Sequence, residues 1–267
     1  MKNDDKLFSR LEQLNIIGAS LSKEHDVHRL VEAILVAAKT ITHADGGTLY
    51  LLTADRAALR FEIMRTDSLN IALGGTTGQP MTFPDLPLVN QYGQPNNTMV
   101  AAYAANQGKT INIADAYVED GFDFSGTRAF DEQTGYRSQS FLTVPMVNHE
   151  DELIGVLQLI NSKSESGAVV PFSTSDQRLA ESLASQAAIA INNSLKGVGL
   201  ATLIVNGGNG DDRSARIGEA FRIGDQGLEH LLDVVDVVVE VETAFHHRHV
   251  AGVLPIGDRK STRLNSS

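Results

Sequence analysis

Residues 140–161, "SFLTVPMVNHEDELIGVLQLIN", contain two apolar runs separated by the polar segment "NHEDE". Two such runs around a short polar segment are typical of a β-hairpin. A second pair of strands is expected in residues 47–66, "GTLYLLTADRAALRFEIMRT", with a turn near residues 54–57. Because tight turns join strands that run in opposite directions, the sequence predicts a largely antiparallel sheet.

Helical patterns precede and follow these strands. Residues 5–24 and 26–42, and a segment from Ser173 to about Leu195, carry apolar residues at three- and four-residue spacing. A short helix is expected in residues 98–109, stopped by Gly108. We therefore expect an α+β fold, with about five to six antiparallel strands and with the N- and C-terminal helices on one face of the sheet.

The first helix carries a narrow apolar stripe made of Leu7, Leu11, Leu14, Ile17 and Leu21. A stripe of this kind suits pairing with a second copy of the chain, and it suits equally well packing on the helix's own domain. We expect residues 1–25 to act as a linker or dimerisation helix. Residues 68–97, rich in Gly, Pro, Asn and Thr, are expected to form a long connection with little regular structure.

Residues 115–139 are polar but contain aromatic side chains at Tyr117, Phe122, Phe124, Phe130 and Tyr136. Aromatic rings are stabilised by burial, so we expect this segment to pack as a lid on the face of the sheet opposite the terminal helices. Such an arrangement leaves room for a small molecule between the sheet and the lid.

Composition excludes several classes of function. The 267 residues include 33 acidic and 22 basic side chains, a formal charge of −11, which opposes binding to a nucleic-acid backbone. There is no cysteine, so disulfides, thiolate nucleophiles and cysteine-based metal sites are excluded. No signal peptide and no membrane-spanning run is visible. We expect a soluble, cytoplasmic chain without nucleic-acid partners or membrane insertion.

Three segments, "NIADAYVEDGFD", "FDEQTGYRSQSFLTVPMVNHEDELIGVLQLINSKS" and "FSTSDQ", occur in this order and together resemble the GAF domain family. The likeness points to the regulatory GAF domains of cyclic-nucleotide phosphodiesterases and of bacterial signalling proteins, and it covers residues 26–196. It implies a sensory domain that binds a small molecule, with a cyclic nucleotide as the first choice, and that requires no cofactor. From the apolar patterns of the terminal helices we also expect a homodimer formed through these helices.

A family signature runs Asn-Lys, a spacer, Phe, three residues and Asp-Glu. Asn161, Phe172 and Asp176 match it, Lys163 lies one position late, and Gln177 replaces the glutamate. The resemblance implies that a Lys163–Asp176 pair braces the pocket, together with Asn161 and Phe172. The residues themselves predict a capping box from Ser173 to Asp176, with Phe172 as the hydrophobic staple.

The resemblance also implies which residues contact the ligand. Seven positions match family contacts to base, ribose or phosphate: Thr48, Val100, Ala101, Asp131, Thr134, Ser138 and Gln158. Each has a structural alternative, since threonine favours strands, Asp131 and Thr134 suit turns, and Gln158 could be exposed. Arg128 and Arg137 could meet a phosphate, or could form ion pairs with carboxylates of the lid.

Residues 1–196 contain no nucleophile–base set, no phosphate-binding glycine loop and no metal-ligand spacing. We therefore expect no catalysis and no metal site. Two alternatives stay open: a GAF dimerisation or interaction module with a filled pocket, and the front part of an HD-type cyclic-dinucleotide phosphodiesterase. The output domain would be an HD-type phosphohydrolase, a cyclase or a histidine kinase, and none of their motifs is present in this sequence.

Residues 197–267 lack a sustained period. "NGGNGDD" could be a cation loop, and Glu242 with His246, His247 and His249 could form a metal cluster. The last ten residues, "DRKSTRLNSS", are similar to the translation of a common sequencing-library adapter. We therefore expect the chain to end where a sequencing fragment ended, and residues 197–257 to be an out-of-frame tail and not a folded domain.

Overall fold

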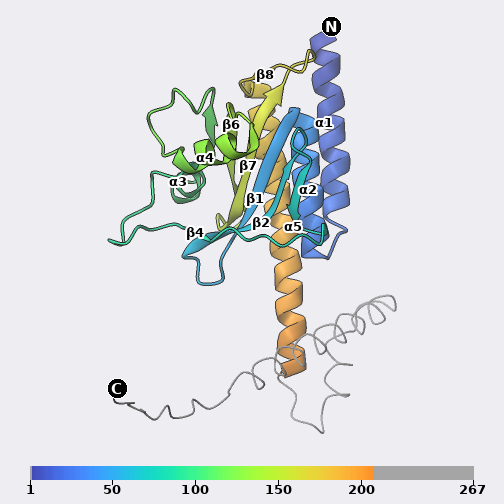
Figure 1. Cartoon of the computed structure of the whole chain (residues 1–267). Helices are drawn as coiled ribbons and strands as arrows, with labels where there is room; N and C mark the ends of the chain where they lie inside the picture. The colour runs from blue at the N-terminus through green and yellow to red at the C-terminus, as the bar shows by residue number, and fades with distance from the viewer. Residues whose placement is uncertain (1, 207–267) are drawn as a thin grey trace, which may run out of the picture. The chain divides into compact units, whose positions relative to one another are not determined.

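The computed structural model describes residues 2–206, and its fold is α+β (Figure 1). The expectations for the cation loop, the histidine cluster and the adapter-like end lie outside the described residues. The helices are α1 Lys2–Leu21, α2 Val27–Thr42, α3 Val100–Gln107, α4 Ser125–Thr134 and α5 Thr174–Asn206. The strands are β1 Ala44–Leu52, β2 Ala58–Thr66, β3 Ile71–Gly74, β4 Leu86–Pro87, β5 Ile111–Ile113, β6 Phe141–Val147, β7 Leu153–Lys163 and β8 Val169–Val170.

The strands form one antiparallel sheet in the order β3-β2-β1-β7-β6-β5, with β4 paired to β2 and β8 paired to β7. The predicted hairpin is confirmed as β6 and β7, and the predicted pair in residues 47–66 is confirmed as β1 and β2. The central pairing joins β1 to β7, so strands from the two halves of the domain lie side by side. The predicted antiparallel α+β fold is confirmed, with the two short strands β4 and β8 added to six main strands.

Side chains alternate between the two faces of the sheet, and the sequence pattern decides which face each one takes. On β1, Leu49 and Leu51 point into the larger core, whereas Tyr50 belongs to a separate cluster on the other face. The larger core is completed by α1, α2 and α5 through apolar residues such as Leu14, Ile34 and Leu183. Three helices therefore cover one face, as predicted.

The helix ends follow the expected chemistry. The carboxylate of Asp26 accepts a 2.9 Å hydrogen bond from the Arg29 amide and caps α2. Gly108, with φ of 60°, takes the left-handed conformation that ends α3, as predicted. The buried Leu14 and Leu21 show that α1 packs on its own domain, which was one of the two readings of its stripe.

The lid covers the opposite face of the sheet, as predicted. Phe124 from the lid and Phe141 from β6 lie in one buried cluster, with ring centroids 5.4 Å apart. Two local features were not predicted. The lid contains the ten-residue helix α4, and residues 68–97, otherwise irregular as expected, contain the short strands β3 and β4. In both segments the elements are too short to produce a clear period.

The last described helix was also predicted too short. We expected it to end near Leu195 and residues from 197 on to be irregular, but α5 continues to Asn206. Gly197 and Gly199 weaken the apolar pattern there, yet a single glycine costs a helix only about 1 kcal/mol. Good helix formers after them, Leu200 and Ala201, offset part of that cost.

Candidate ligand cavity

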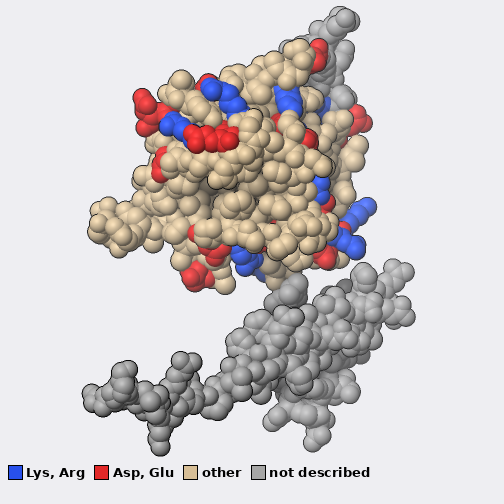
Figure 2. Space-filling view, viewed as in Figure 1, with Lys and Arg blue, Asp and Glu red and all other residues tan. Residues whose placement is uncertain are grey.

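A cavity of about 310 Å³ lies between the sheet, the start of α3 and the lid. This volume falls at the lower end of the range seen for small-molecule pockets. Seven aromatic rings line it, namely Tyr50, Phe61, Phe83, Phe124, Phe130, Tyr136 and Phe141. Figure 2 shows that charged side chains gather toward the margins of this face of the domain, while the hollowed middle is uncharged.

The sheet contributes neutral hydrogen-bonding groups to the cavity. Thr48 on β1 lies in register opposite Gln158 on β7, and Gln158 lies opposite Thr143 on β6. The Gln158 amide donates to the Thr143 hydroxyl at 3.0 Å, and its carbonyl accepts from the Tyr50 hydroxyl at 3.4 Å. These two bonds orient the amide at the floor of the cavity.

The start of α3 forms a second wall. Val100 and Ala101 line the cavity, and Met99 precedes the helix without making a side-chain cap. The first backbone N–H groups of a helix have no intrahelical partner and carry a partial positive charge. Groups of this kind can interact with an anion.

The lid is held together by Asp131. Its carboxylate accepts hydrogen bonds from the Tyr117 hydroxyl at 2.7 Å, the Ser138 amide at 2.7 Å and the Ser138 hydroxyl at 2.8 Å. The bond to Asp131, followed by burial, raises the pKa of Tyr117. Asp131 is only 3% exposed, so these bonds fix the chain on both sides of α4.

The seven expected contact residues fall into two groups, those that line the cavity and those that do not. Five of them line the cavity: Thr48, Val100, Ala101, Ser138 and Gln158. Asp131 and Thr134 do not line it. Asp131 is occupied within the lid, and the Thr134 hydroxyl donates to the Phe130 carbonyl at 2.8 Å, a bond inside α4. Both residues therefore have structural bonds within the lid, from positions in α4 and not from the turns considered as the alternative for them.

Asn161 lies where the lid chain meets β7. Its backbone is left-handed, with φ of 58°. Its side chain donates to the Arg137 carbonyl at 2.7 Å and accepts from the amides of Gln139 at 2.7 Å and Ser140 at 3.2 Å. Asn161 therefore ties the end of the lid to the sheet, which supports the bracing role that the resemblance implied.

The expected Lys163–Asp176 pair is wrong. Lys163 forms its ion pair with Asp45, and Asp176 forms one with Arg10 of α1. The strand register explains this, because the Lys163 amide donates to the His43 carbonyl at 2.9 Å and brings Lys163 beside the start of β1. The carboxylate of Asp176 is also engaged locally, since it accepts from the Ser173 amide at 2.9 Å.

The predicted capping box is confirmed. The Asp176 amide donates to the Ser173 hydroxyl at 3.1 Å, reciprocating the bond from the Ser173 amide. Phe172, immediately before it, is 4% exposed and belongs to the larger core. The signature residues Phe172 and Asp176 therefore hold the start of α5, and the ion pair of Lys163 holds the start of β1.

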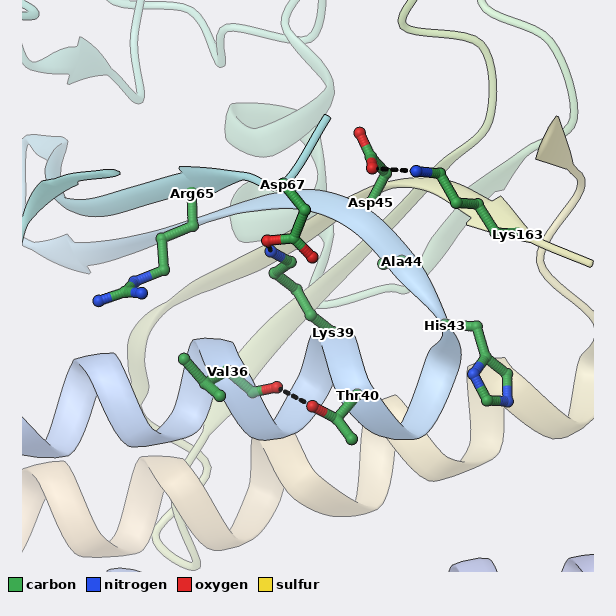
Figure 3. Close-up of a pocket in the computed structure, with 9 residues that line it drawn as sticks. All are labelled: Val36, Lys39, Thr40, His43, Ala44, Asp45, Arg65, Asp67 and Lys163. Carbon is green, nitrogen blue, oxygen red and sulfur yellow. Dashed lines mark hydrogen bonds and ion pairs between the residues drawn. The ribbon is translucent and has the colours of Figure 1, made fainter. Parts of the chain in front are cut away.

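A second hollow, of about 480 Å³, lies beside the C-terminal end of α2 (Figure 3). Its cations are already paired: Lys39 with Asp67, at 2.5 Å, and Lys163 with Asp45. Arg65, also at its edge, pairs with Glu32. These three cations of the hollow are therefore already paired with carboxylates, and we do not assign this charged groove a ligand.

Several lining residues were not expected from the sequence. Tyr50 follows Thr48 at the two-residue spacing of a strand, a signal that could have placed it on the same face. Phe83 comes from the irregular segment before α3, and it lies 5.2 Å from Phe61, centroid to centroid. Asp123, two residues before α4 in the lid, also lines the cavity, and no sequence pattern marked it.

The comparisons with known proteins agree with this architecture. The sequence model of the GAF domain matches residues 26–191. The dual 3',5'-cyclic-AMP and -GMP phosphodiesterase 11A of Takifugu rubripes is 37% identical over 94 residues, which cover 35% of this chain and 10% of that protein. The cGMP-specific 3',5'-cyclic phosphodiesterase of Drosophila sechellia is 28% identical over 146 residues, which cover 53% of this chain and 11% of that protein.

Solved structures share the fold. The GAF domain of a phosphoenolpyruvate-protein phosphotransferase from Coxiella burnetii superposes with a TM-score of 0.50 at 13% identity, covering 72% of this chain and 98% of that one. The free methionine-R-sulfoxide reductase of Neisseria meningitidis gives a TM-score of 0.50 at 16% identity, covering 72% and 93%.

The antiparallel sheet, with terminal helices on one face and a lid on the other, is the fold that these two structures share. The chain belongs to the GAF domain family. It spans about a tenth of the length of the phosphodiesterases it matches. None of the helices within residues 2–206 combines the length and the apolar character needed to span a bilayer.

Proposed function

We propose that this domain is the sensor of a signalling protein and binds a cyclic nucleotide in the cavity between the sheet and the lid. The observation that carries the proposal is the 310 Å³ cavity itself, bounded by Thr48, Val100 and Gln158. A GAF domain that served only as an interaction module would fill this space with its own side chains. The names of the matching phosphodiesterases support the choice of ligand.

The chemistry of the walls suits such a ligand. Aromatic rings such as Phe61 and Phe141 offer faces and edges for a purine ring. Thr48 and Gln158 offer neutral donors and acceptors for the edge of the base. The uncapped start of α3 offers backbone N–H groups for a phosphate.

Signal output would follow from ordering of the lid. A ligand that binds the closed lid better than the open one shifts the population toward the closed state. The lid is tied to β7 through Asn161 and to β1 through Tyr136, and both strands lie against the layer of α2 and α5. Terminal helices that pair with a second copy of the chain would carry the change to an output domain.

Isothermal titration calorimetry of the full chain with cyclic AMP and cyclic GMP tests the proposal. Thr48→Val removes a hydroxyl from the cavity without changing its shape. Thr40→Val is the matched control, because Thr40 is exposed on α2 and bonds only to the Val36 carbonyl at 2.8 Å. We expect saturable binding, weakened about tenfold by Thr48→Val and unchanged by Thr40→Val. If neither cyclic AMP nor cyclic GMP binds, the proposal is contradicted and the interaction module is favoured.

A further inference from the structure

The walls of the cavity carry almost no charge. No Lys, Arg or His is found among the described residues that line it, and Asp123 is the one charged residue there. The two arginines of the lid are engaged elsewhere. Arg137 lies 3.6 Å from the carboxylate of Asp115, and its guanidinium lies 4.0 Å from the centre of the Tyr117 ring. Arg128 lies 5.8 Å from the centre of the same ring.

Asp123 is held close to the start of α3. Its amide donates to the Thr98 carbonyl at 2.8 Å, two residues before the helix begins, and its carboxylate accepts from the Ser125 amide at 2.8 Å. The hydrogen bonds from Ser125 lower the pKa of Asp123, and the charge of Arg128 lowers it further. Asp123 is therefore an anion at neutral pH, next to the wall that would receive a phosphate.

With these walls, the affinity for a ligand should depend on the ligand's charge. A phosphate monoester carries about 1.5 to 2 negative charges at pH 7. A cyclic phosphodiester carries one charge, and a nucleoside carries none. The start of a helix is equivalent to only about half a positive charge. A second negative charge would thus meet no cation of the cavity wall, and the exposed carboxylate of Asp123 adds negative charge to that same wall.

We propose that the cavity selects by charge, accepting singly charged cyclic phosphodiesters or uncharged ring compounds and rejecting doubly charged phosphate monoesters, with Asp123 as the specificity-determining residue. This selection deepens the proposed function and rests on it, because it concerns the same cavity.

The test uses the full chain and calorimetric titration with adenosine, cyclic AMP and 5'-AMP, and with the corresponding guanine compounds, at pH 5.0 and pH 7.5. The second ionisation of a phosphate monoester has a pKa of about 6, so 5'-AMP gains a charge between these two values whereas cyclic AMP does not. We expect the affinity for 5'-AMP to fall about tenfold from pH 5.0 to pH 7.5 and that for cyclic AMP to change less than about twofold.

The titratable groups at and next to the cavity keep their charge in this window. Asp123 stays ionised, and so does Asp45, which lies outside the cavity, bonds to Tyr136 of its wall and has a pKa below its ordinary value. Burial raises the pKa of the phenols of Tyr50 and Tyr136, so both stay protonated. Arg128 of α4 stays positively charged throughout. The pH dependence therefore reports the charge of the ligand.

The variant Asp123→Asn removes the charge and keeps the shape. Asp120→Asn is its matched control, an exposed aspartate of the same loop that does not line the cavity. We expect Asp123→Asn to reduce the preference for cyclic AMP over 5'-AMP at pH 7.5 by about fivefold, and Asp120→Asn to leave it unchanged. A preference unaffected by Asp123→Asn would overturn the role of Asp123.

The outcomes separate this inference from the proposed function. Equal binding of 5'-AMP and cyclic AMP at pH 7.5 would overturn charge selection and leave the proposed function intact. Binding of nucleosides without cyclic nucleotides would contradict the proposed function and support exclusion of charge. Binding of none of the six compounds would contradict both.

Discussion

The hydroxyl of Tyr136 donates a 2.6 Å hydrogen bond to the carboxylate of Asp45. Tyr136 lines the cavity from the lid, whereas Asp45 lies on β1, three residues after the end of α2. The same carboxylate accepts from the Ser68 hydroxyl at 2.6 Å and pairs with Lys163. One side chain that is 1% exposed therefore joins the lid, two strands and the turn after β2.

The first prediction concerns this connection. Tyr136→Phe removes the hydroxyl and leaves the ring in the cavity wall. We expect the free energy of unfolding to fall by about 2 kcal/mol, since a hydrogen bond to a buried carboxylate is lost. Amide hydrogen exchange should accelerate in the lid and also in residues 66–70, whose chain is bonded to Asp45.

Tyr117→Phe is the matched control. Its hydroxyl bonds to Asp131, which lies within the lid, at 2.7 Å. Faster exchange should then be confined to the lid. If Tyr136→Phe left exchange in residues 66–70 unchanged, the hydrogen bond to Asp45 would not couple the lid to the sheet.

The second prediction concerns the contribution of Asp45 to stability at low pH. Burial raises the pKa of Asp45, but hydrogen bonds from Lys163, Ser68 and Tyr136 outweigh it, so the pKa lies below its ordinary value of 3.8. A carboxyl whose pKa is lower in the folded state stabilises the fold above pH 4 and loses that contribution as the pH falls below it. Urea unfolding should show Asp45→Asn less stable than wild type at pH 7, with the difference shrinking at pH 3. A difference that is the same at both pH values would argue against this role.

The fold could be predicted further than the site. The hairpin of residues 140–161 and the helices at the two ends have periods long enough to identify them, and burial follows those periods. Short elements such as α4 and β4 have no such period. The partner of Lys163 depends on the register of β7 against β1, which brings together residues more than a hundred positions apart. The periodicity of a single strand does not determine that register.

The contact residues illustrate the same limit. Thr48 and Gln158 were expected in the cavity from the family resemblance alone, and both line it. Their neighbours Leu49, Leu157 and Leu159 point into the larger core on the other face. Asp131 could not be assigned correctly, because its environment is set by Tyr117 and Ser138 on either side of a helix that the sequence did not reveal. Phe83 lies in a segment without periodicity, so nothing indicated that its ring would reach Phe61.

The third prediction tests the corrected ion pair. In a double-mutant cycle, Lys163→Met and Asp45→Asn should show a coupling energy of about 1 kcal/mol or more, because residues in direct contact are coupled. The cycle of Lys163→Met with Asp176→Asn should be additive within about 0.5 kcal/mol, since these residues have separate partners. Chemical denaturation provides all the values. Strong coupling between Lys163 and Asp176 would restore the arrangement expected from the family signature.

The fourth prediction concerns Asn161. Asn161→Ala and Asn161→Gly both remove the side-chain bonds to Arg137, Gln139 and Ser140. In addition, alanine but not glycine is strained in the left-handed backbone conformation, which costs about 1–2 kcal/mol of stability. We expect both variants to be destabilised and Asn161→Ala to be the less stable by about 1 kcal/mol in thermal unfolding. Equal stability of the two would mean that the backbone at residue 161 relaxes on substitution.

Occupation of the cavity beneath the lid by a cyclic nucleotide can be measured residue by residue. The backbone amide resonances of the full chain are followed by NMR during titration with cyclic GMP or cyclic AMP. We expect saturable shifts concentrated at the cavity wall, at Val100, Ala101 and Ser138. Shifts centred instead on the charged groove around Lys39 and Asp67, or no shifts with either nucleotide, would contradict this expectation.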